Sequence, residues 1–598
     1  MEKLLVANRG EIAVRVIRTA REMGLQTVAI YSEIDRDALH VRLADEAYLV
    51  GPANPAQSYL NIDRVLELAK RAEADAIHPG YGFLAENARF ARAVQDAGLI
   101  WIGPHPEAID LMGDKIRARQ TMLAAKVPVV PGGTEPIKTL AAAQAAAKRY
   151  GFPIALKASG GGGGKGLKVA RSAEELGSAL SLAQREAEAY FKDSTIYAER
   201  YLENPKHIEL QLLGDKHGSV VHYGERDCSL QRRHQKLLEE APPKISQRVR
   251  DGIREAGVRA ARAMRYDSAG TIEWLVSGDE FFFLEMNTRI QVEHTVTEMI
   301  AGVDLVREQI RIAGGEKLGY DQNAIAFSGY AIEGRINAED PSHEFRPAPG
   351  VVTNYREPAG LGVRVDSAAF PGFKISADYD SLVAKLVVWA PARDQALARF
   401  RRALDEYVIE GVRTTLPFLR ALSDVPQVID GSYTTSTLEL FAVNEYALSP
   451  SSDSPRGSSY LGMTTKPNVI PTLRPVSAQA PEGRSETITV EVNDKLYRVR
   501  LFDLPSRMRK ARREPPRFDR KSNHVHVDAD DVVSPMHGVV VEVLVREGQE
   551  VATGDVVAVV EAMKMMNEIR AHKPGKIGKL HVKPGETVES RTPLVTFA

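Results

Sequence analysis

The sequence contains a single cysteine, Cys228, in 598 residues, so no disulfide can form within the chain. A protein without disulfides suits a reducing compartment. The chain also lacks an apolar run long enough to span a membrane, and its first residues lack the apolar core of a signal peptide. We therefore expect a cytoplasmic protein with no membrane-spanning segment.

There is also no excess of charge of either sign. Lysine and arginine number 78 and aspartate and glutamate 79, which gives a formal net charge of −1. No global field steers such a chain toward nucleic acid or an anionic membrane, and neither is predicted as a partner. A chain of this length cannot be built around one core, and we expect about three to five domains.

The N-terminal region alternates strand and helix patterns. Residues 3–7 predict a buried strand, and the apolar spacing that follows predicts a helix that ends at Gly24. Further strands are expected at 27–31, 76–78 and 100–102, so an open parallel sheet is predicted. The first turn has no G-x-G-x-x-G, which gives dinucleotide binding little support.

A run of glycines lies between two predicted strands, residues 154–157 and 167–170. Residues 159–166 read SGGGGGKG, and no Ser or Thr follows the lysine as a P-loop requires. A flexible linker has the same composition. The flanking strands and the nearby Lys157 favour a mobile hairpin whose backbone N–H groups close over phosphates.

An acidic hairpin follows further along the chain. Residues 271–275 and 283–287 predict two strands that carry Glu273 and Glu285, joined by a loop at residues 277–280. Both carboxylates share a face only if the loop holds an odd number of residues. Mg²⁺ prefers oxygen ligands of this kind. Beyond Glu285, polar residues recur at every second position and would point one way in an extended chain; they are Asn287, Arg289, Gln291 and Glu293.

The last 65 residues contain an internal repeat with an offset of 37 residues, for example Gly538 with Gly575 and Gly548 with Gly585. Two similar β half-units around one core are therefore expected, with residues 561–567 at their junction. This junction reads EAMKMMN and contains Lys564. An ordinary surface lysine is the alternative, but methionines on both sides of a protruding lysine are poorly explained by packing.

The region before this repeat changes in composition. Residues 449–485 are rich in proline and serine, residues 487–502 alternate like a β-hairpin with Asn493-Asp494 at the turn, and residues 507–521 carry eight basic side chains. The basic stretch suits a solvated tether. A docking segment or an RNA-binding patch is the alternative.

The segments VANRGEIA, HPGYGFLAEN, MGDK, KASGGGGGKG, ERDCSLQRRHQK, EMNTRIQVEH and EGRINAED resemble the biotin carboxylase family, and the EAMKMM segment resembles the biotinyl domain. The resemblance implies an α/β and α+β multidomain chain. A Rossmann-like (pre-ATP-grasp) domain over 1–112 precedes an ATP-grasp lid over 113–204 and the ATP-grasp core with the carboxylase C-terminal domain over 205–445. A linker with the hairpin and basic segment over 446–530 leads to an all-β biotinyl domain of flattened-barrel form over 531–598. A lipoyl domain shares that last fold, but its lysine usually lacks the A-M-K-M frame.

The resemblance also implies a role for each site residue. The ATP-binding set is Lys115, Lys157, Gly162, Gly163, Glu199, Leu202, His207, Gln231 and His234. The metal ligands, for Mg²⁺ or Mn²⁺, are Glu273, Glu285 and Asn287. Bicarbonate is held by Lys236, Arg289, Gln291 and Val292. Glu293 is the general base, Arg335 steadies the biotin enolate, and Lys564 carries the covalent biotin.

The function implied is an ATP- and bicarbonate-dependent biotin carboxylase, a ligase that loads biotin on its own chain. Carboxybiotin would pass to a separate carboxyltransferase subunit for acetyl-CoA or propionyl-CoA, as in fatty acid biosynthesis, because no carboxyltransferase is recognisable in this sequence. Biotin protein ligase and further copies of the chain, paired through the carboxylase region, are the other partners expected. Another ATP-grasp ligase and a pure biotin carrier are the competing interpretations; the biotinyl segment opposes the first and the intact metal and base positions oppose the second.

Two residues depart from the family pattern. Thr295 stands where proline is usual, which could loosen the segment that carries Glu293, and Lys165 stands where arginine is common. Cys228 lies in a matching segment, and a small buried residue is favoured there over a nucleophile.

Overall fold

The computed structural model describes residues 1–133, 135–158, 167–191, 195–232, 235–438, 485–492, 495–502, 530–536, 538–562, 565–589 and 591–598. The central glycines of the predicted lid, the hairpin turn Asn493-Asp494, the basic stretch 507–521 and Lys564 lie outside these residues.

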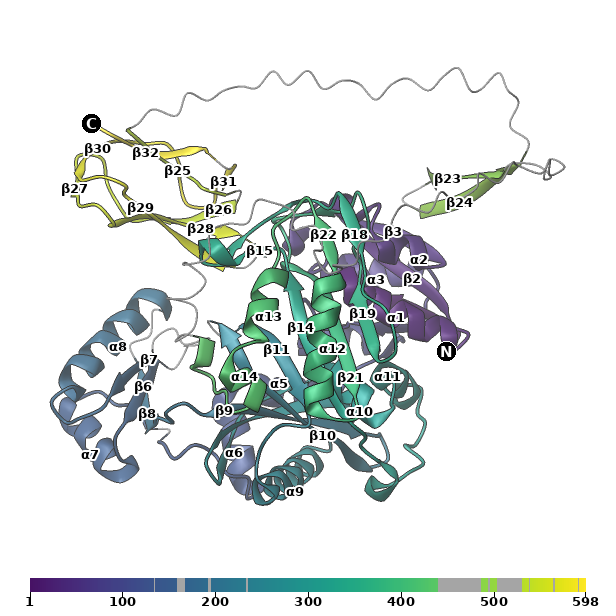
Figure 1. Cartoon of the computed structure of the whole chain (residues 1–598), viewed down its shortest axis with the longest axis horizontal. Coiled ribbons are helices and arrows are strands. Elements are labelled where there is room, and N and C mark those ends of the chain that lie inside the picture. Colours follow the sequence, from purple (N-terminus) through teal and green to yellow (C-terminus); the bar gives the residue numbers. More distant parts are fainter. Residues whose placement is uncertain are drawn as a thin grey trace, which may run out of the picture.

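The N-terminal region, purple in Figure 1, contains a parallel sheet, as the sequence predicts. Its strands follow the order β3-β2-β1-β4-β5. Its strands are β1 Lys3–Val6, β2 Gln26–Ser32, β3 Glu46–Gly51, β4 Ala76–His78 and β5 Ile100–Trp101. Its helices are α1 Gly10–Glu22, α2 Leu39–Leu43, α3 Ile62–Arg71 and α4 Ala88–Asp96. Alternate residues of β1 and β2 enter two separate apolar cores, because helices cover both faces of the sheet.

A small antiparallel sheet, β7-β6-β8, forms the second unit. Its strands are β6 Ile154–Ala158, β7 Leu167–Ala170 and β8 Ile196–Arg200, and its helices are α7 Leu140–Tyr150 and α8 Leu176–Phe191. One face of the sheet packs on these helices through a core of alanine, leucine and isoleucine. The strands on both sides of the glycine run are therefore confirmed.

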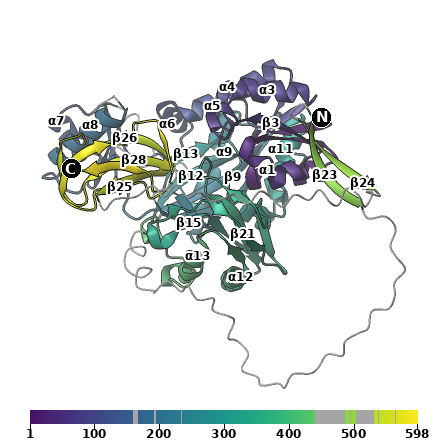
Figure 2. The same ribbon diagram turned by 90° about the horizontal axis from the view of Figure 1, so that it is seen from above.

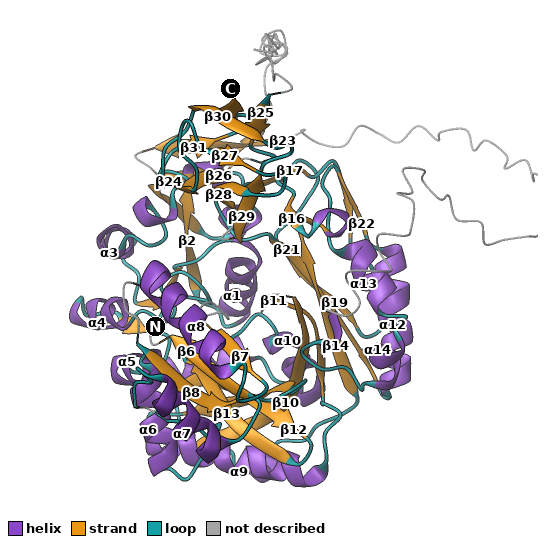
Figure 3. Cartoon of the chain, turned by 90° about the vertical axis from the view of Figure 1, so that its left-hand side faces the viewer, coloured by secondary structure: helices purple, strands orange, loops and turns teal. Residues whose placement is uncertain are grey.

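The largest sheet has eight antiparallel strands in the order β13-β12-β9-β10-β11-β14-β21-β19. They are β9 Lys206–Gly214, β10 Val220–Arg232, β11 Gln235–Ala241, β12 Ser268–Ser277, β13 Glu280–Asn287, β14 Tyr330–Asn337, β19 Val363–Ser367 and β21 Leu382–Ala390. The helices that accompany it are α5 Pro106–Gly113, α6 Lys115–Ala124, α9 Gln247–Ala263, α10 His294–Ala301, α11 Leu305–Ala313, α12 Arg393–Glu406, α13 Leu416–Leu422 and α14 Pro426–Asp430. In Figure 3, α12 lies against β14 and β21.

Three short antiparallel ladders complete this part of the chain. They pair β15 Glu339–Asp340 with β16 Arg346–Pro347, β17 Gly350–Val351 with β20 Lys374–Ile375, and β18 Asn354–Arg356 with β22 Val408–Glu410.

The predicted hairpin is present as β23 Ser485–Val492 and β24 Lys495–Phe502. It extends the N-terminal sheet, because β24 pairs antiparallel with the edge strand β3 at Lys495 and Tyr48 (Figure 2).

The C-terminal unit consists of two four-stranded antiparallel sheets, β25-β32-β30-β27 and β29-β28-β26-β31. Its strands are β25 Asp531–Val533, β26 Gly538–Val543, β27 Glu550–Val551, β28 Val556–Ala562, β29 Met565–Arg570, β30 Gly575–Leu580, β31 Thr587–Val588 and β32 Pro593–Phe597. Strands β26, β27 and β28 begin 37 residues before β30, β31 and β32, so the predicted repeat is a structural one. Gly548 and Gly585 occupy the same left-handed conformation in the two halves.

Buried histidines predict how the N-terminal sheet responds to acid. Burial lowers the pKa of His40 and His78 to about 4. The unfolded chain takes up these protons near pH 6.5, whereas the folded chain does not until about pH 4, so stability falls as the pH drops through that window. At pH 5 each histidine lowers the free energy of unfolding by about 2 kcal/mol relative to its value at neutral pH.

The two histidines should therefore lower the thermal midpoint as the pH is reduced from 7 to 5, while buried carboxyl groups with a raised pKa, such as Glu11, act in the opposite direction. A His40→Gln/His78→Gln chain should lose less over the same interval, whatever its midpoint at pH 7. An equal loss in both chains would contradict this account.

Candidate active site

Lys236 lies at the centre of a group of buried carboxylates. Its Nζ donates to Glu273 Oε1 at 3.0 Å and to Glu293 Oε1 at 2.8 Å, and it also contacts Glu209. Burial alone would lower the pKa of Lys236, but the negative charges of these carboxylates hold it well above the usual value. The ammonium is therefore a fixed positive charge among acids drawn from three different elements.

Glu293 links Lys236 to Arg335. It occupies the N-cap position of α10 without a capping hydrogen bond from its side chain, and its second oxygen, Oε2, accepts a hydrogen bond from Arg335 Nη2 at 2.9 Å. Burial and Glu209 favour the neutral acid, but Lys236 and Arg335 outweigh them and lower the pKa of Glu293. An ionised carboxylate between two cations can accept a proton from a substrate bound beside it.

Arg335 has a second carboxylate partner, Glu239 on the neighbouring strand, at 2.6 Å from Nε to Oε1. Burial is the main cause that raises the pKa of Glu239 to about 8. Burial likewise raises the pKa of Glu333, two residues before Arg335 on β14, to about 7. The Arg335 guanidinium is therefore held by Glu239 on β11 as well as by Glu293.

The acidic hairpin pairs Glu273 directly with Glu285, but not as the sequence predicts. The turn between β12 and β13 holds two residues, Gly278 and Asp279, because Ser277 pairs with Glu280. The prediction of an odd-numbered loop is therefore wrong. A β-bulge at Leu284 adds one residue to β13, and this extra residue brings the two glutamates into register.

The donors on this hairpin suit a divalent cation. Glu273 and Asn287 are joined by a 2.8 Å hydrogen bond from the amide to the carboxylate. Partial desolvation, and then the negative charge of Glu273, raises the pKa of Glu285. Two facing carboxylates and an amide oxygen are typical Mg²⁺ ligands, and a cation among them relieves the repulsion between the acids. The residues present thus fit Mg²⁺ or Mn²⁺.

The extended run predicted beyond Glu285 is only partly present. Strand β13 ends at Asn287, and bends and a turn lead from there into α10. The polar side chains nevertheless meet: Arg289 Nη2 donates to Asn287 Oδ1 at 2.8 Å, and Gln291 Nε2 donates to Glu273 Oε1 at 2.8 Å. The bends bring these side chains together and lead the chain into α10, whose N-cap position is Glu293.

The predicted nucleotide residues fall into separate places. Lys157 forms an ion pair with Glu199 across the small sheet. Leu202 is buried beside Val130 and Phe282, and Lys115 begins α6. Gly162, Gly163 and His234 lie outside the described residues.

Two other predicted nucleotide residues, Gln231 and His207, lie against Lys236 and the carboxylates around it. Gln231 pairs with Lys236 across the β10–β11 hairpin. His207 Nε2 lies 2.9 Å from Glu273 Oε2. Burial alone would lower the pKa of His207, but Glu273 raises it to about 9. The structure thus places His207 against a predicted metal ligand.

Sequence reasoning missed several residues of the centre. Arg226 is fully buried and donates to Glu209 and Gln211 on β9 and to Gln291. Glu86, from the N-terminal region, accepts from Arg289 Nε at 2.9 Å. The polar positions 207, 209 and 211, at every second residue of an otherwise apolar strand, were a signal that could have revealed Glu209.

Cys228 is fully buried, and burial raises the pKa of its thiol well above the usual value. A thiol that stays protonated is a poor nucleophile, which favours its interpretation as a small buried residue.

Strands β28 and β29 pair directly at Ala562 and Met565. Lys564 falls between them in the sequence and lies outside the described residues.

Fold and site together define an ATP-grasp ligase joined to a small two-fold β domain. Residues 1–109 match the biotin carboxylase N-terminal domain, and residues 114–320 match the ATP-binding domain of the carbamoyl-phosphate synthase L chain. Residues 333–440 match the biotin carboxylase C-terminal domain, and residues 530–597 match the biotin-requiring enzyme domain.

Relatives agree with these matches. Biotin carboxylase 1 of Bacillus subtilis is 50% identical over 74% of this chain and 99% of its own length. The biotin-dependent acyl-coenzyme A carboxylase alpha3 subunit of Mycobacterium leprae is 45% identical over 99% of this chain and 98% of its own. The biotin carboxylase domain dimer of Hydrogenobacter thermophilus 2-oxoglutarate carboxylase, solved with MgADP, ADP and bicarbonate, is 51% identical, with a TM-score of 0.69 over 73% of this chain and 97% of its own.

The chain therefore belongs to the biotin carboxylase family and is an ATP-dependent ligase whose C-terminal domain carries biotin covalently. Within the described ranges, no helix is both long and apolar enough to cross a membrane.

Proposed function

We propose that the chain carboxylates the biotin attached to its own Lys564 and supplies the resulting carboxybiotin to a separate carboxyltransferase subunit. The acceptor is a short-chain acyl-CoA: acetyl-CoA, giving malonyl-CoA, or propionyl-CoA, giving methylmalonyl-CoA. The observation that carries the carboxylase half is the Glu293 carboxylate, held between Lys236 and Arg335 beside the acidic hairpin. The similarity to the Mycobacterium leprae subunit supports the acceptor, because it extends through the linker and biotinyl regions.

Glu293 removes the proton of bicarbonate, which is a weak nucleophile, so that it can attack the γ-phosphate of ATP; ADP leaves and carboxyphosphate is formed. Lys236 and Arg289 neutralise the charge of the bound bicarbonate, with Gln291 and the Val292 backbone as its polar neighbours. Glu273, Glu285 and Asn287 hold Mg²⁺, which offsets the charge of the phosphates when it is bound.

Arg335 provides the fixed charge at the second step. When bound, biotin would supply a ring nitrogen that takes the carboxyl group as carboxyphosphate releases phosphate. Its N–H proton would pass to that phosphate or to Glu293, and the negative charge would develop on the ureido oxygen. A guanidinium stays protonated at any working pH, and the carboxylates around Arg335 raise its pKa further although burial opposes this. Lys115, Lys157 and the backbone of Gly162 and Gly163 bind the phosphates, Glu199 and Leu202 the adenine, and His207, Gln231 and His234 the ribose and phosphate side.

We propose in addition that copies pair through the carboxylase region. The similar Hydrogenobacter domain is a dimer. Leu361, in the loop that leads into β19, is 84% exposed, as suits an apolar side chain that a partner covers.

The division of labour predicts what the purified chain does alone. With ATP, Mg²⁺ and labelled bicarbonate it should incorporate label on the protein, because both the carboxylase centre and the carrier are present. It should carboxylate no acyl-CoA until a carboxyltransferase is added. Steady acyl-CoA carboxylation by the isolated chain, with no second protein detectable by mass spectrometry, would contradict the proposal.

A further inference from the structure

The start of α10 is tied to β14 by a buried hydrogen bond that the reaction does not use. Thr295, the second residue of the helix, donates from Oγ1 to Glu333 Oε2. Both residues are completely buried, and the other oxygen of Glu333 has no hydrogen-bond partner in the described structure. Thr295 is therefore the polar partner on which this carboxylate depends.

The same strand and the same helix are joined a second time through the catalytic residues. Glu333 and Arg335 are two positions apart on β14, so their side chains leave the same face of the sheet. Arg335 donates to Glu293, the residue at the N-cap position of the helix that contains Thr295. Two parallel contacts thus connect α10 to β14, and only one of them includes the base.

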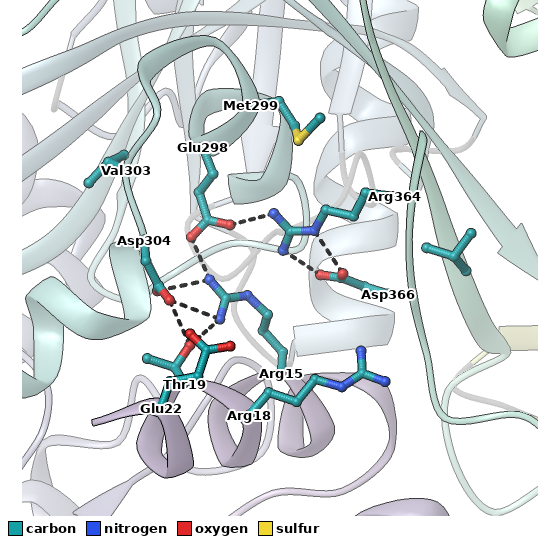
Figure 4. A pocket seen from close by; sticks show the side chains of 11 residues that line it. Arg15, Arg18, Thr19, Glu22, Glu298, Met299, Val303, Asp304, Arg364 and Asp366 are labelled. Atoms are coloured by element: carbon teal, nitrogen blue, oxygen red, sulfur yellow. Dashed lines mark hydrogen bonds and ion pairs between the residues drawn. The ribbon is translucent and has the colours of Figure 1, made fainter. Parts of the chain in front are cut away.

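The rest of the segment is held from other elements. Lys385 Nζ on β21 donates to the Val292 carbonyl at 2.9 Å. One turn into α10, Glu298 accepts from Arg15 and from Arg364, each at 2.8 Å (Figure 4). These contacts fix the chain before the base and the far side of the helix. In the first turn after Glu293, Thr295 donates to Glu333 on β14, and Thr297 accepts from Arg226 on β10 at 3.0 Å.

The contact between Arg335 and Glu293 cannot hold this turn throughout the reaction. Under the proposed function, on which this step rests, Arg335 must turn its charge toward biotin and Glu293 must take up a proton. Each event weakens the ion pair between them. The contact between Thr295 and Glu333 contains neither Arg335 nor Glu293, the two groups that react in these events.

We propose that Thr295 and Glu333 are positioning residues that keep Glu293 in place while Arg335 serves the substrate. The hydroxyl supplies the bond and the carboxylate supplies the anchor on β14. The departure from proline at this position thus coincides with a specific polar contact to the strand that carries Arg335.

Thr295→Val keeps the shape of the side chain and removes the hydroxyl. We expect kcat for bicarbonate-dependent ATP cleavage with free biotin to fall about tenfold, while KM for ATP stays within about twofold, because the nucleotide residues lie elsewhere. Thr295→Ser, the matched control, keeps the hydroxyl and should retain most of kcat. Thr295→Val combined with Glu333→Leu should be no slower than the slower single variant, since both break one contact.

A wild-type kcat in Thr295→Val, an equal loss in Thr295→Ser, or additive losses in the double variant would each overturn the proposal. If Thr295→Val did not fold, as judged by its thermal midpoint, Thr295→Ala would serve for the same comparison. Failure of the proposed function would be distinguishable, because the unmutated chain would then show no biotin-dependent ATP cleavage at all.

Discussion

Replacing Lys564 with arginine should abolish attachment of biotin to the chain. The cofactor is joined through an amide to the amine of a lysine. Arginine keeps the positive charge, but its guanidinium cannot form this amide. Strands β28 and β29 pair at Ala562 and Met565, and Lys564 falls between these two residues in the sequence. The avidin-blot signal should vanish, and so should the transfer of the carboxyl group of labelled bicarbonate to the protein.

The same variant should still cleave ATP in the presence of bicarbonate and free biotin, because the carboxylase centre is built from residues before position 340. Lys579→Arg, on the exposed surface of β30 in the same domain, is the matched control and should be biotinylated normally. Residual labelling of the Lys564→Arg chain would place the cofactor on another lysine.

Glu293→Gln should reduce turnover with free biotin by about 10²-fold or more, the usual size of a lost general base. The amide cannot accept the bicarbonate proton at neutral pH, yet it has nearly the shape of the acid. Lys236 keeps Glu209 and Glu273, and Arg335 keeps Glu239, so neither cation is left unpaired. The loss should therefore fall on kcat and leave the fold intact.

Bicarbonate-dependent ATP cleavage at saturating substrate, together with the thermal midpoint, checks this expectation. Glu316→Gln changes an exposed glutamate that pairs with Arg311 on the surface, and it should behave as the unmutated chain does. Turnover of Glu293→Gln within about threefold of normal would assign the proton to another group.

The sequence predicts the elements better than the way in which they are joined. Short apolar strands and the 37-residue repeat are local patterns, and both are confirmed in the structure. The bulge at Leu284 could not be predicted, because a single extra residue leaves no sign in an alternating sequence. It changes the loop length for which Glu273 and Glu285 share a face from odd to even. Neither does periodicity show that β13 ends at Asn287 and turns into a helix.

The buried partners were the hardest part of the site to foresee. Arg226 and Glu209 lie on adjacent strands but meet only when the sheet forms, and Glu86 approaches from the turn before α4 in the N-terminal region. Such contacts depend on which strands become neighbours, and the order of strands in a sheet follows from the packing of the whole chain.

The order of the parts along the chain also sets an order of events during synthesis. Every residue placed around Glu293 precedes the end of β21, whereas the biotinyl strands begin only at Asp531. Domains fold largely as they emerge from the ribosome, the N-terminal ones first. The nascent chain thus completes its carboxylase before the ribosome reaches the codon for Lys564, and a message cut short between them yields an enzyme that spends ATP on free biotin but has no carrier to deliver the product.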